Sequence, residues 1–230
     1  FDDSFTSRRR HLTAMLSTAL PATVYGQLFF PYSGGALQMA LVFGLLLILL
    51  MELLGWNSED APGFNRHSIA AVGTLLYPGF LMTFPVRFIF FDRTVEVILL
   101  FLLLNFGNDT FAYIFGKLLG KKSKKLFPVS PKKTLVGFVG GFIGALLVGG
   151  AFLLILPDLF HGGPLALTGF FLLVALCADI GDLVESAFKR GVAKKDSGRI
   201  MPGRGGLLDS IDSLLFSAPI FYYIGTILLN

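Results

Sequence analysis

The stretch LALTGFFLLVALCADI at residues 165–180, followed by GDLVESAFKRG at 181–191, indicates how this chain folds. The first part is almost wholly apolar and is close to the length that a helix needs to cross a bilayer. The second part keeps helical spacing but brings carboxylates, and then cations, onto one face. The sequence therefore predicts a membrane helix that ends in a charged segment.

The rest of the chain has the same apolar character. Of its 230 residues, 54% are hydrophobic and 15% are charged, and the mean hydropathy is +0.73. A water-soluble enzyme or a disordered chain is excluded by this composition, and the lone Cys177 excludes an internal disulfide scaffold. Channel, transporter and membrane enzyme remain open. We expect an all-α, polytopic integral membrane protein with about seven transmembrane helices, at residues 12–30, 36–54, 69–91, 95–118, 134–156, 165–180 and 207–229.

The basic residues orient these spans, because Lys and Arg accumulate in cytoplasmic loops. With the N-terminus in the cytoplasm, seventeen of the nineteen Lys and Arg lie inside, and only Arg87 and Arg93 lie outside. The predicted topology is therefore a cytoplasmic N-terminus and an external C-terminus. Pro78 and Pro85 predict a kink or break in the third span. The chain begins at Phe1 and not at Met, so we expect N-terminal residues to be missing.

The basic loops have two interpretations, which are orientation alone and the binding of anionic head groups or phosphates. Orientation alone is favoured for the lysines at 121–125. Lys132 and Lys133 belong to SPKKT at a helix start, where Ser130 or Thr134 can cap the helix and free amide groups can meet an anion. For this pair we favour anion binding.

Acidic residues gather at two predicted helix ends near the C-terminus. The residues that share one face of the first helix are Asp179, Asp182, Glu185 or Ser186, and Lys189. On the second helix, Asp209 and Asp212 are three residues apart and also share a side. Carboxylates at membrane depth indicate a functional site, and with the Lys-, Arg- and Gly-rich loop between them they fit phosphoryl or nucleotidyl transfer. The alternative is a set of interfacial ion pairs.

A second polar group lies in the fourth span, where Asn105, Asn108 or Asp109, and Tyr113 form a stripe at helical spacing. The stripe either forms interhelical hydrogen bonds or lines a site, and the ionisable Asp109 favours a site wall. Glu52 is expected to be paired or to reach the interface. The glycines of the fifth span repeat at small-xxx-small spacing, which predicts close helix packing.

Together, these blocks resemble the phosphatidate cytidylyltransferases, also called CDP-diacylglycerol synthases. That family combines a Ser, Lys-Arg, Lys-Asp, a Pro-Gly-His-Gly-Gly turn and Asp-Arg-x-Asp. The matching residues are Ser186, Lys189, Arg190, Lys195, Asp196, Pro202, Gly203, Arg204, Gly205, Gly206, Asp209, Ser210 and Asp212. With the upstream NDTFAYIFGKLLGKK and SPKKT blocks, the resemblance covers residues 108–213. The chain departs from the family pattern in three places: Arg204 replaces His, Ser210 replaces Arg, and the pair Leu135-Val136 replaces Trp-Glu.

The resemblance implies roles for these residues. The catalytic set would be Lys189, Arg190, Asp182 and Asp209. Mg²⁺ would be held by Asp182 and Asp209, with Asp212 and Asp179 beside them, and a second cation is compatible with the site. The phosphates would be held by Lys132, Lys133, Lys189 and Arg190, with Ser186 and Lys195 close by. Asp196 would orient the loop, Arg204 would add a cation, and Gly203, Gly205 and Gly206 would let the backbone approach a phosphate. Asp109 and Tyr113 would line the cavity.

The implied reaction converts CTP and phosphatidic acid to CDP-diacylglycerol and pyrophosphate in phospholipid biosynthesis. We expect an Mg-dependent nucleotidyltransferase of the bacterial cytoplasmic membrane, with its site on the cytoplasmic side. Membrane lipid is an expected partner, nucleic acid is not, and a homodimer is compatible with the glycine-rich fifth span. Residues 1–68 would form N-terminal membrane helices, and residues 69–230 would carry the motifs without a soluble domain.

Two rival functions follow from the same residues. A CDP-alcohol phosphotransferase also carries Asp on membrane helices, but that family opens with Asp-Gly and leaves three residues between its last carboxylates. Asp209 and Asp212 leave only two, and Asp-Gly is absent. The other rival is a diverged, noncatalytic lipid-binding or transport protein.

The Asp209→Asn variant is expected to lose Mg²⁺-dependent turnover of CTP.

Overall fold

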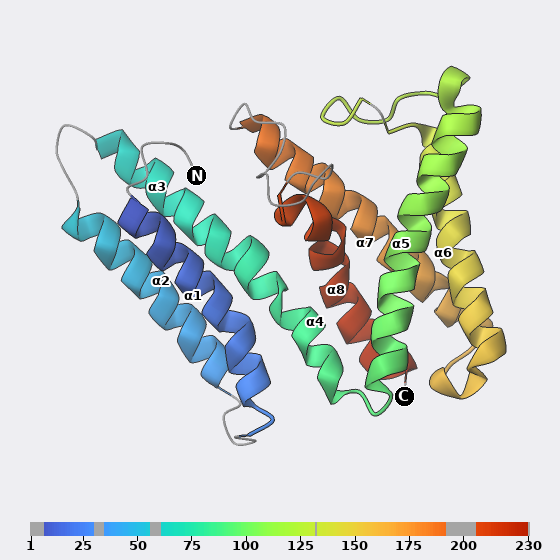
Figure 1. Cartoon of the computed structure of the whole chain (residues 1–230), viewed down its shortest axis with the longest axis horizontal. Coiled ribbons are helices and arrows are strands. Elements are labelled where there is room, and N and C mark those ends of the chain that lie inside the picture. The colour runs from blue at the N-terminus through green and yellow to red at the C-terminus, as the bar shows by residue number, and fades with distance from the viewer. Residues whose placement is uncertain (1–6, 30–34, 56–60, 132, 192–205, 230) are drawn as a thin grey trace. The chain divides into compact units, whose positions relative to one another are not determined.

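The computed structural model describes residues 7–29, 35–55, 61–131, 133–191 and 206–229 (Figure 1). Within these ranges the regular elements are helices, and the strand-like pairing consists of two isolated bridges. The α-helices are α1 (Ser7–Gly26), α2 (Ala36–Leu54), α3 (Ala61–Thr74), α4 (Thr83–Arg87), α5 (Thr94–Leu119), α6 (Leu135–Ile155), α7 (Pro164–Gly191) and α8 (Leu208–Leu228). The predicted all-α class is confirmed.

Among the described residues, six helices are long and apolar enough to cross a membrane. They are Ala36–Leu54, Gly63–Phe90, Thr94–Leu119, Leu135–Ile155, Pro164–Gly191 and Leu208–Leu228, so the protein is a polytopic membrane protein. The first predicted span also forms a helix, α1, but hydroxyl and charged side chains dilute it and it is not one of the six. The predicted location of the two chain ends on opposite sides therefore depends on whether α1 crosses the membrane, and it stays a prediction.

The chain divides into two compact units, Phe1–Arg87 and Phe88–Asn230. In the first unit, Leu20 and Val24 of α1 are buried in one core with Ile48 of α2 and Leu75. The less apolar α1 is thus packed along its neighbours. The predicted division into residues 1–68 and 69–230 concerns which residues carry the function, and it stays a prediction.

Two buried polar side chains of the first unit find partners inside it. The hydroxyl of Ser17 donates to the carbonyl of Thr74 at 3.0 Å. The buried carboxylate of Glu52 accepts a hydrogen bond from Arg9 at 3.0 Å, so the expected pairing of Glu52 is confirmed. Pro78 lies in a π-helical segment, Leu75–Phe80, after which the helix is interrupted before α4. The predicted irregularity of this span is therefore confirmed, since proline removes a helical hydrogen bond.

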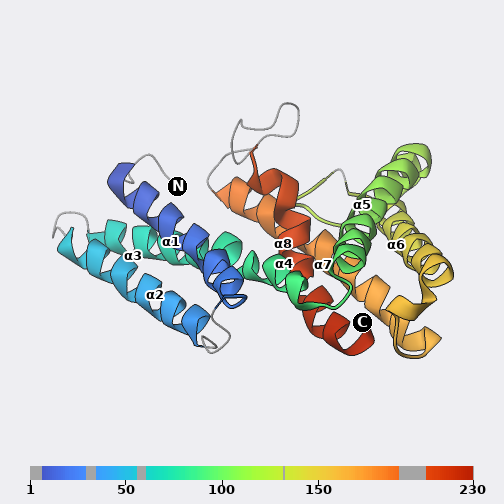
Figure 2. The same ribbon diagram turned by 60° about the horizontal axis from the view of Figure 1, so that its bottom comes forward.

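The second unit contains α5–α8, and α5 lies along α6 in both ribbon views (Figure 1 and Figure 2). Glycine permits this approach. A Cβ atom at Gly141 would lie 2.4 Å from Asn108 Oδ1, and one at Gly144 would lie 2.6 Å from the carbonyl oxygen of Gly107. Larger residues cannot fit there, so the predicted close packing of the fifth span is confirmed.

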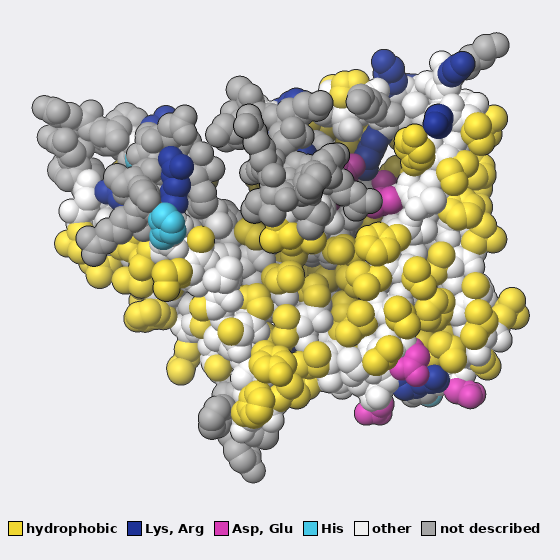
Figure 3. Space-filling model, viewed as in Figure 1, with side chains coloured by type: hydrophobic (Ala, Val, Ile, Leu, Met, Phe, Trp, Pro, Cys, Tyr) yellow, Lys and Arg dark blue, Asp and Glu magenta, His cyan; other side chains and the backbone are white. Residues whose placement is uncertain are grey.

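Aromatic rings join α5, α7 and α8 inside the second unit. The Phe221 ring lies 5.0 Å from Phe101 and 5.2 Å from Phe170. Beside them, the hydroxyl of Ser217 donates to Asn105 Oδ1 at 2.9 Å. Asn105 therefore forms an interhelical hydrogen bond, one of the two alternatives for its stripe. In this unit, hydrophobic side chains cover the middle of the helices, and Lys and Arg gather near the α5–α6 connection (Figure 3).

Candidate functional site

The ends of two helices of the second unit position the site. The first half of α7 is apolar and buries Phe170, Phe171 and Val174. Its second half carries the carboxylates, and α8 begins with the second acidic pair, Asp209 and Asp212. Because α7 and α8 pack together, the charged end of one helix meets the charged start of the other.

Three carboxylates from these helices form a compact group, which we call the acidic triad: Asp182, Glu185 and Asp212. Oxygen atoms of all three lie within 4.8 Å of one another. Glu185 is 1% exposed, Asp212 is also buried, and the Asp182 side chain is 41% exposed. Carboxylates this close repel each other when charged, so a bound cation would stabilise the arrangement.

The donor atoms of the acidic triad fit a hard divalent cation. Mg²⁺ takes carboxylate oxygens and keeps open positions for water or phosphate. Among the described residues, Glu185 Oε1 is buried and has no hydrogen-bond partner. A buried, unsatisfied carboxylate oxygen is costly, and a bound cation would satisfy it. The half-exposed Asp182 leaves one side of the triad accessible.

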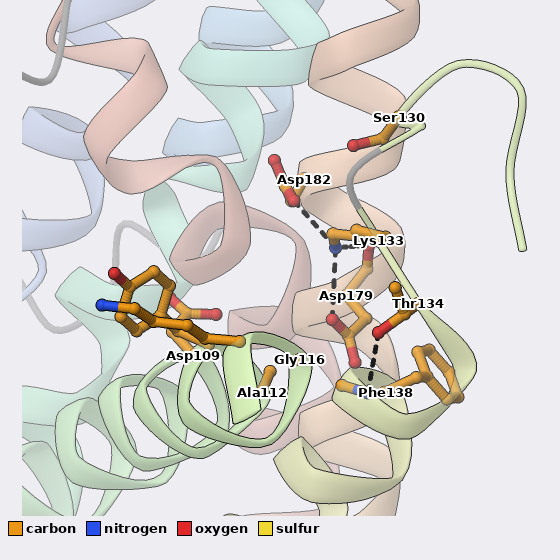
Figure 4. A pocket seen from close by; sticks show the side chains of 12 residues that line it. Asp109, Ala112, Gly116, Ser130, Lys133, Thr134, Phe138, Asp179 and Asp182 are labelled. Atoms are coloured by element: carbon orange, nitrogen blue, oxygen red, sulfur yellow. Dashed lines mark hydrogen bonds and ion pairs between the residues drawn. The ribbon is translucent and has the colours of Figure 1, made fainter. Parts of the chain in front are cut away.

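Lys133 reaches the acidic triad from the loop before α6. Its ammonium group lies 2.7 Å from Asp182 Oδ2 and 3.2 Å from Asp179 Oδ1, and it donates to the carbonyl of Asp179 at 3.3 Å (Figure 4). Burial lowers the pKa of Lys133, but the nearby Asp182 and Asp179 carboxylates outweigh burial and raise the pKa above its ordinary value. Lys133 is therefore held in its charged form.

The backbone around Lys133 is fixed at the start of α6. The Thr134 hydroxyl accepts a hydrogen bond from the amide of Gly137 at 3.2 Å, so the predicted capping by Thr134 is confirmed. The amide of Lys133 donates to Ser130, and its carbonyl accepts from Leu126. These bonds hold the base of the Lys133 side chain beside α7.

Lys189 connects the acidic triad to Asp209. Its ammonium group lies 2.5 Å from Glu185 Oε2 and 2.7 Å from Asp209 Oδ1. The other oxygen of Asp209 accepts a hydrogen bond from the amide of Gly206 at 2.6 Å, at the start of α8. Asp209 thus stabilises the helix start and also holds Lys189.

A cavity of about 490 Å³ opens beside Lys133 and is lined by α5, α6 and α7 (Figure 4). Its polar lining includes Asp109, Tyr113, Asp179 and Asp182, and Phe138 contributes an apolar wall. Asp109 and Tyr113 are among its lining residues, and their predicted role in lining a substrate cavity stays a prediction. Because one edge is polar and another is apolar, the cavity can receive a molecule with a charged head and an apolar remainder.

The structure describes only part of the predicted site. Asp182, Asp212, Asp179, Asp209, Lys133 and Lys189 come together as described above. Ser186 is half-buried in α7, Arg190 is exposed near its end, and Gly206 is buried before α8. The predicted site residues that lie outside the described residues are Lys132, Lys195, Asp196, Gly203, Arg204 and Gly205.

Glu185 was not among the predicted site residues. Its spacing gave a signal, because it lies three residues after Asp182 and shares its helix face. That spacing left Glu185 and Ser186 as alternatives. Burial and contact with Asp212, which belongs to the next helix, identify Glu185 as the member of the acidic triad.

The Lys189→Met variant is expected to lower the free energy of unfolding by about 2 kcal/mol, because it leaves the buried Glu185 and Asp209 without their shared cation. Thermal unfolding in detergent measures this effect. Lys189→Arg keeps the charge and should recover most of the loss. Equal stability of the Met and Arg variants would show that this ion pair does not support the fold.

The fold and these contacts define a polytopic membrane protein with a carboxylate and lysine centre at the ends of two packed helices. The sequence profile of the Cytidylyltransferase family matches residues 3–228, so the chain belongs to that family.

Relatives with a named activity are similar over most of the chain. The chain is 44% identical over 183 residues to the phosphatidate cytidylyltransferase of Staphylococcus aureus (strain COL). Over the same length it is 40% identical to that of Staphylococcus saprophyticus and 42% identical to that of Staphylococcus epidermidis. Each alignment covers 79% of this chain and 65% of the relative. The chain therefore spans slightly less than two thirds of these relatives.

Proposed function

We propose that this protein is a phosphatidate cytidylyltransferase, which converts CTP and phosphatidic acid to CDP-diacylglycerol and pyrophosphate. The observation that carries the proposal is the juxtaposition of the acidic triad with Lys133 and Lys189, in a chain of the cytidylyltransferase family. The activity named for the Staphylococcus relatives supports it.

The reaction suits a site made of carboxylates and lysines. A phosphate oxygen of the lipid attacks the α-phosphorus of CTP, and the bond from the α-phosphorus to the oxygen that bridges to the β-phosphorus breaks to release pyrophosphate. The attacking oxygen is already ionised at neutral pH, so a catalytic Ser, Cys or His is not required. What the site must supply is in-line positioning and neutralisation of phosphate charge.

The acidic triad would hold Mg²⁺ through Asp182, Glu185 and Asp212, with Asp209 and Asp179 close by. The bound ion would neutralise charge on the reacting phosphates. Lys189 keeps Glu185 and Asp209 oriented, and Lys133 would bind a phosphate at the cavity. A second cation in this group of carboxylates also remains part of the proposal.

The cavity beside Lys133 would receive the reacting head groups. Asp109 and Tyr113 line one wall, and Phe138 gives an apolar surface against which a lipid can lie. The remaining cations and glycines of the motif would complete the phosphate site: Lys132, Arg190, Lys195, Gly203, Arg204, Gly205 and Gly206, with Ser186 and Asp196 as supporting residues.

The site would face the cytoplasm, where CTP is available. The support is the predicted topology, which assigns seventeen of the nineteen Lys and Arg, among them Lys133 and Lys189, to cytoplasmic segments. The glycine-rich α6 is compatible with a homodimer, although its Gly140, Gly141 and Gly144 already pack against α5. The proposed partners are therefore CTP, phosphatidic acid and the surrounding lipid.

The purified protein, in mixed micelles with phosphatidic acid, Mg²⁺ and radiolabelled CTP, is expected to form a labelled CDP-lipid and to release pyrophosphate. Omitting phosphatidic acid or adding EDTA should stop both. Labelled CTP that remains intact, with the protein folded and lipid present, would overturn the proposed activity and favour the noncatalytic alternative. Transfer of the lipid phosphate group from a CDP-lipid to an alcohol would favour a CDP-alcohol phosphotransferase.

A further inference from the structure

Asp182 belongs to two arrangements at once. Its carboxylate is one corner of the acidic triad, and its Oδ2 atom also lies 2.7 Å from the ammonium group of Lys133. Of the three acids in the triad, Asp182 is the most exposed, and it lines the cavity as Lys133 does. An incoming cation and the ammonium group of Lys133 would therefore both contact the carboxylate of Asp182.

The hydrogen-bonding capacity of Lys133 is already filled. An ammonium group has three protons, and the described contacts are with Asp182 Oδ2, Asp179 Oδ1 and the carbonyl oxygen of Asp179. To bind a phosphate in the cavity, Lys133 must give up at least one of these contacts. The contact with Asp182 is the most accessible, because Asp179 is 5% exposed and Asp182 is 41% exposed.

Lys133 can make this change without movement of the backbone. The hydrogen bonds that hold its amide and carbonyl are within the loop, and Thr134 caps α6. The side chain has four rotatable methylene groups. Asp179 lies deeper and can keep hold of the ammonium group while Asp182 is released, so a rotation of the side chain would expose more of the ammonium group to the cavity that Lys133 already lines.

We propose that Lys133 is an exchangeable internal counter-ion of Asp182, which competes with a divalent cation for this carboxylate until a substrate phosphate draws Lys133 away. The identity of that phosphate rests on the proposed function. Binding of the cation and binding of the phosphate are then coupled, and the coupling is reciprocal, since each releases a partner of the same ion pair.

The first test measures Mn²⁺ affinity in detergent and in the absence of nucleotide, by electron paramagnetic resonance of the free ion. The Lys133→Met variant is expected to bind Mn²⁺ about fivefold to tenfold more tightly than the wild type, which corresponds to loss of a partly exposed ion pair. Lys133→Arg keeps the charge and should stay within twofold of the wild type.

A matched control separates exchange from a general effect of charge. Lys117 lines the same cavity, but its ammonium group lies over the Tyr113 ring at 5.5 Å. Lys117→Met removes one positive charge nearby and is expected to change the Mn²⁺ affinity less than twofold. Equal affinities for the Lys133→Met and Lys117→Met variants, with thermal unfolding like that of the wild type, would overturn the proposal.

The second test measures binding of radiolabelled CTP in EDTA by equilibrium dialysis. Asp182→Asn frees Lys133 and is expected to tighten metal-free CTP binding about fivefold, while Lys133→Met weakens it. In the double variant, the gain from Asp182→Asn should disappear. A gain that persists without Lys133 would overturn the exchange.

Failure of this inference and failure of the proposed function give different results. If the wild type makes no CDP-lipid but Lys133→Met still tightens Mn²⁺ binding, the function fails and competition for Asp182 stands. If the wild type makes the CDP-lipid and the Mn²⁺ affinity does not respond to Lys133, the function stands and the inference fails.

Discussion

Asp182→Asn is expected to lower the rate of CDP-lipid formation by about 10³-fold. The substitution keeps the shape of the side chain but replaces the carboxylate of Asp182 by a neutral amide. The cation would therefore lose the charge of its most accessible ligand in the acidic triad. It also leaves Lys133 with Asp179 alone. The measurement is the initial rate with radiolabelled CTP and phosphatidic acid across a range of Mg²⁺ concentrations.

Asp92→Asn is the matched control for this variant. Asp92 is an exposed carboxylate that precedes α5, at the opposite end of that helix from Lys117. Its removal should leave the rate unchanged. Activity of Asp182→Asn within tenfold of the wild type at saturating Mg²⁺ would remove Asp182 from the proposed metal site, provided both variants unfold at the same temperature.

The length of the apolar runs was enough to predict most of the fold. Six predicted spans correspond to long apolar helices, because a bilayer imposes a minimum length that can be read along the chain. The first span could not be settled in this way. A hydropathy score averages over the whole segment, and α1 scores low. The helix nevertheless buries Leu20 and Val24, and its Ser17 hydroxyl donates to the carbonyl of Thr74 in α3. Such packing depends on neighbours that a local average does not contain.

The candidate site was predictable up to the face of each helix. Steps of three and four residues put Asp182 and Lys189 on one side of α7, and the lysine does contact Glu185 on that helix. Spacing cannot say which carboxylates meet across two helices, because that depends on how each helix is rotated against the other. The proximity of Glu185 to Asp212, and of Lys189 to Asp209, therefore came only from the structure.

The packing of α7 against α8 is what sets these distances, and Gly181 is the residue that permits it. A Cβ atom at Gly181 would lie 2.8 Å from the backbone oxygen of Asp212 and 2.6 Å from Phe216 Cβ. Backbone cannot rotate away as a side chain can, so any larger residue at this position must push the helices apart. Asp182 follows Gly181 directly, and the backbone oxygen that a Cβ atom would meet belongs to Asp212 on the facing helix. Pushing the helices apart would therefore increase the distance between Asp182 and Asp212 in the acidic triad.

The Gly181→Ala variant is therefore expected to lose about 3 kcal/mol of unfolding free energy and about 10²-fold in activity, with weaker Mn²⁺ binding. Gly169→Ala is the matched control in the same helix, because a Cβ atom there would meet nothing within 4 Å and alanine favours helix by about 1 kcal/mol. Thermal unfolding, Mn²⁺ titration and initial rates compare the pair. If the two variants behaved alike, close contact between α7 and α8 would not control the geometry of the acidic triad.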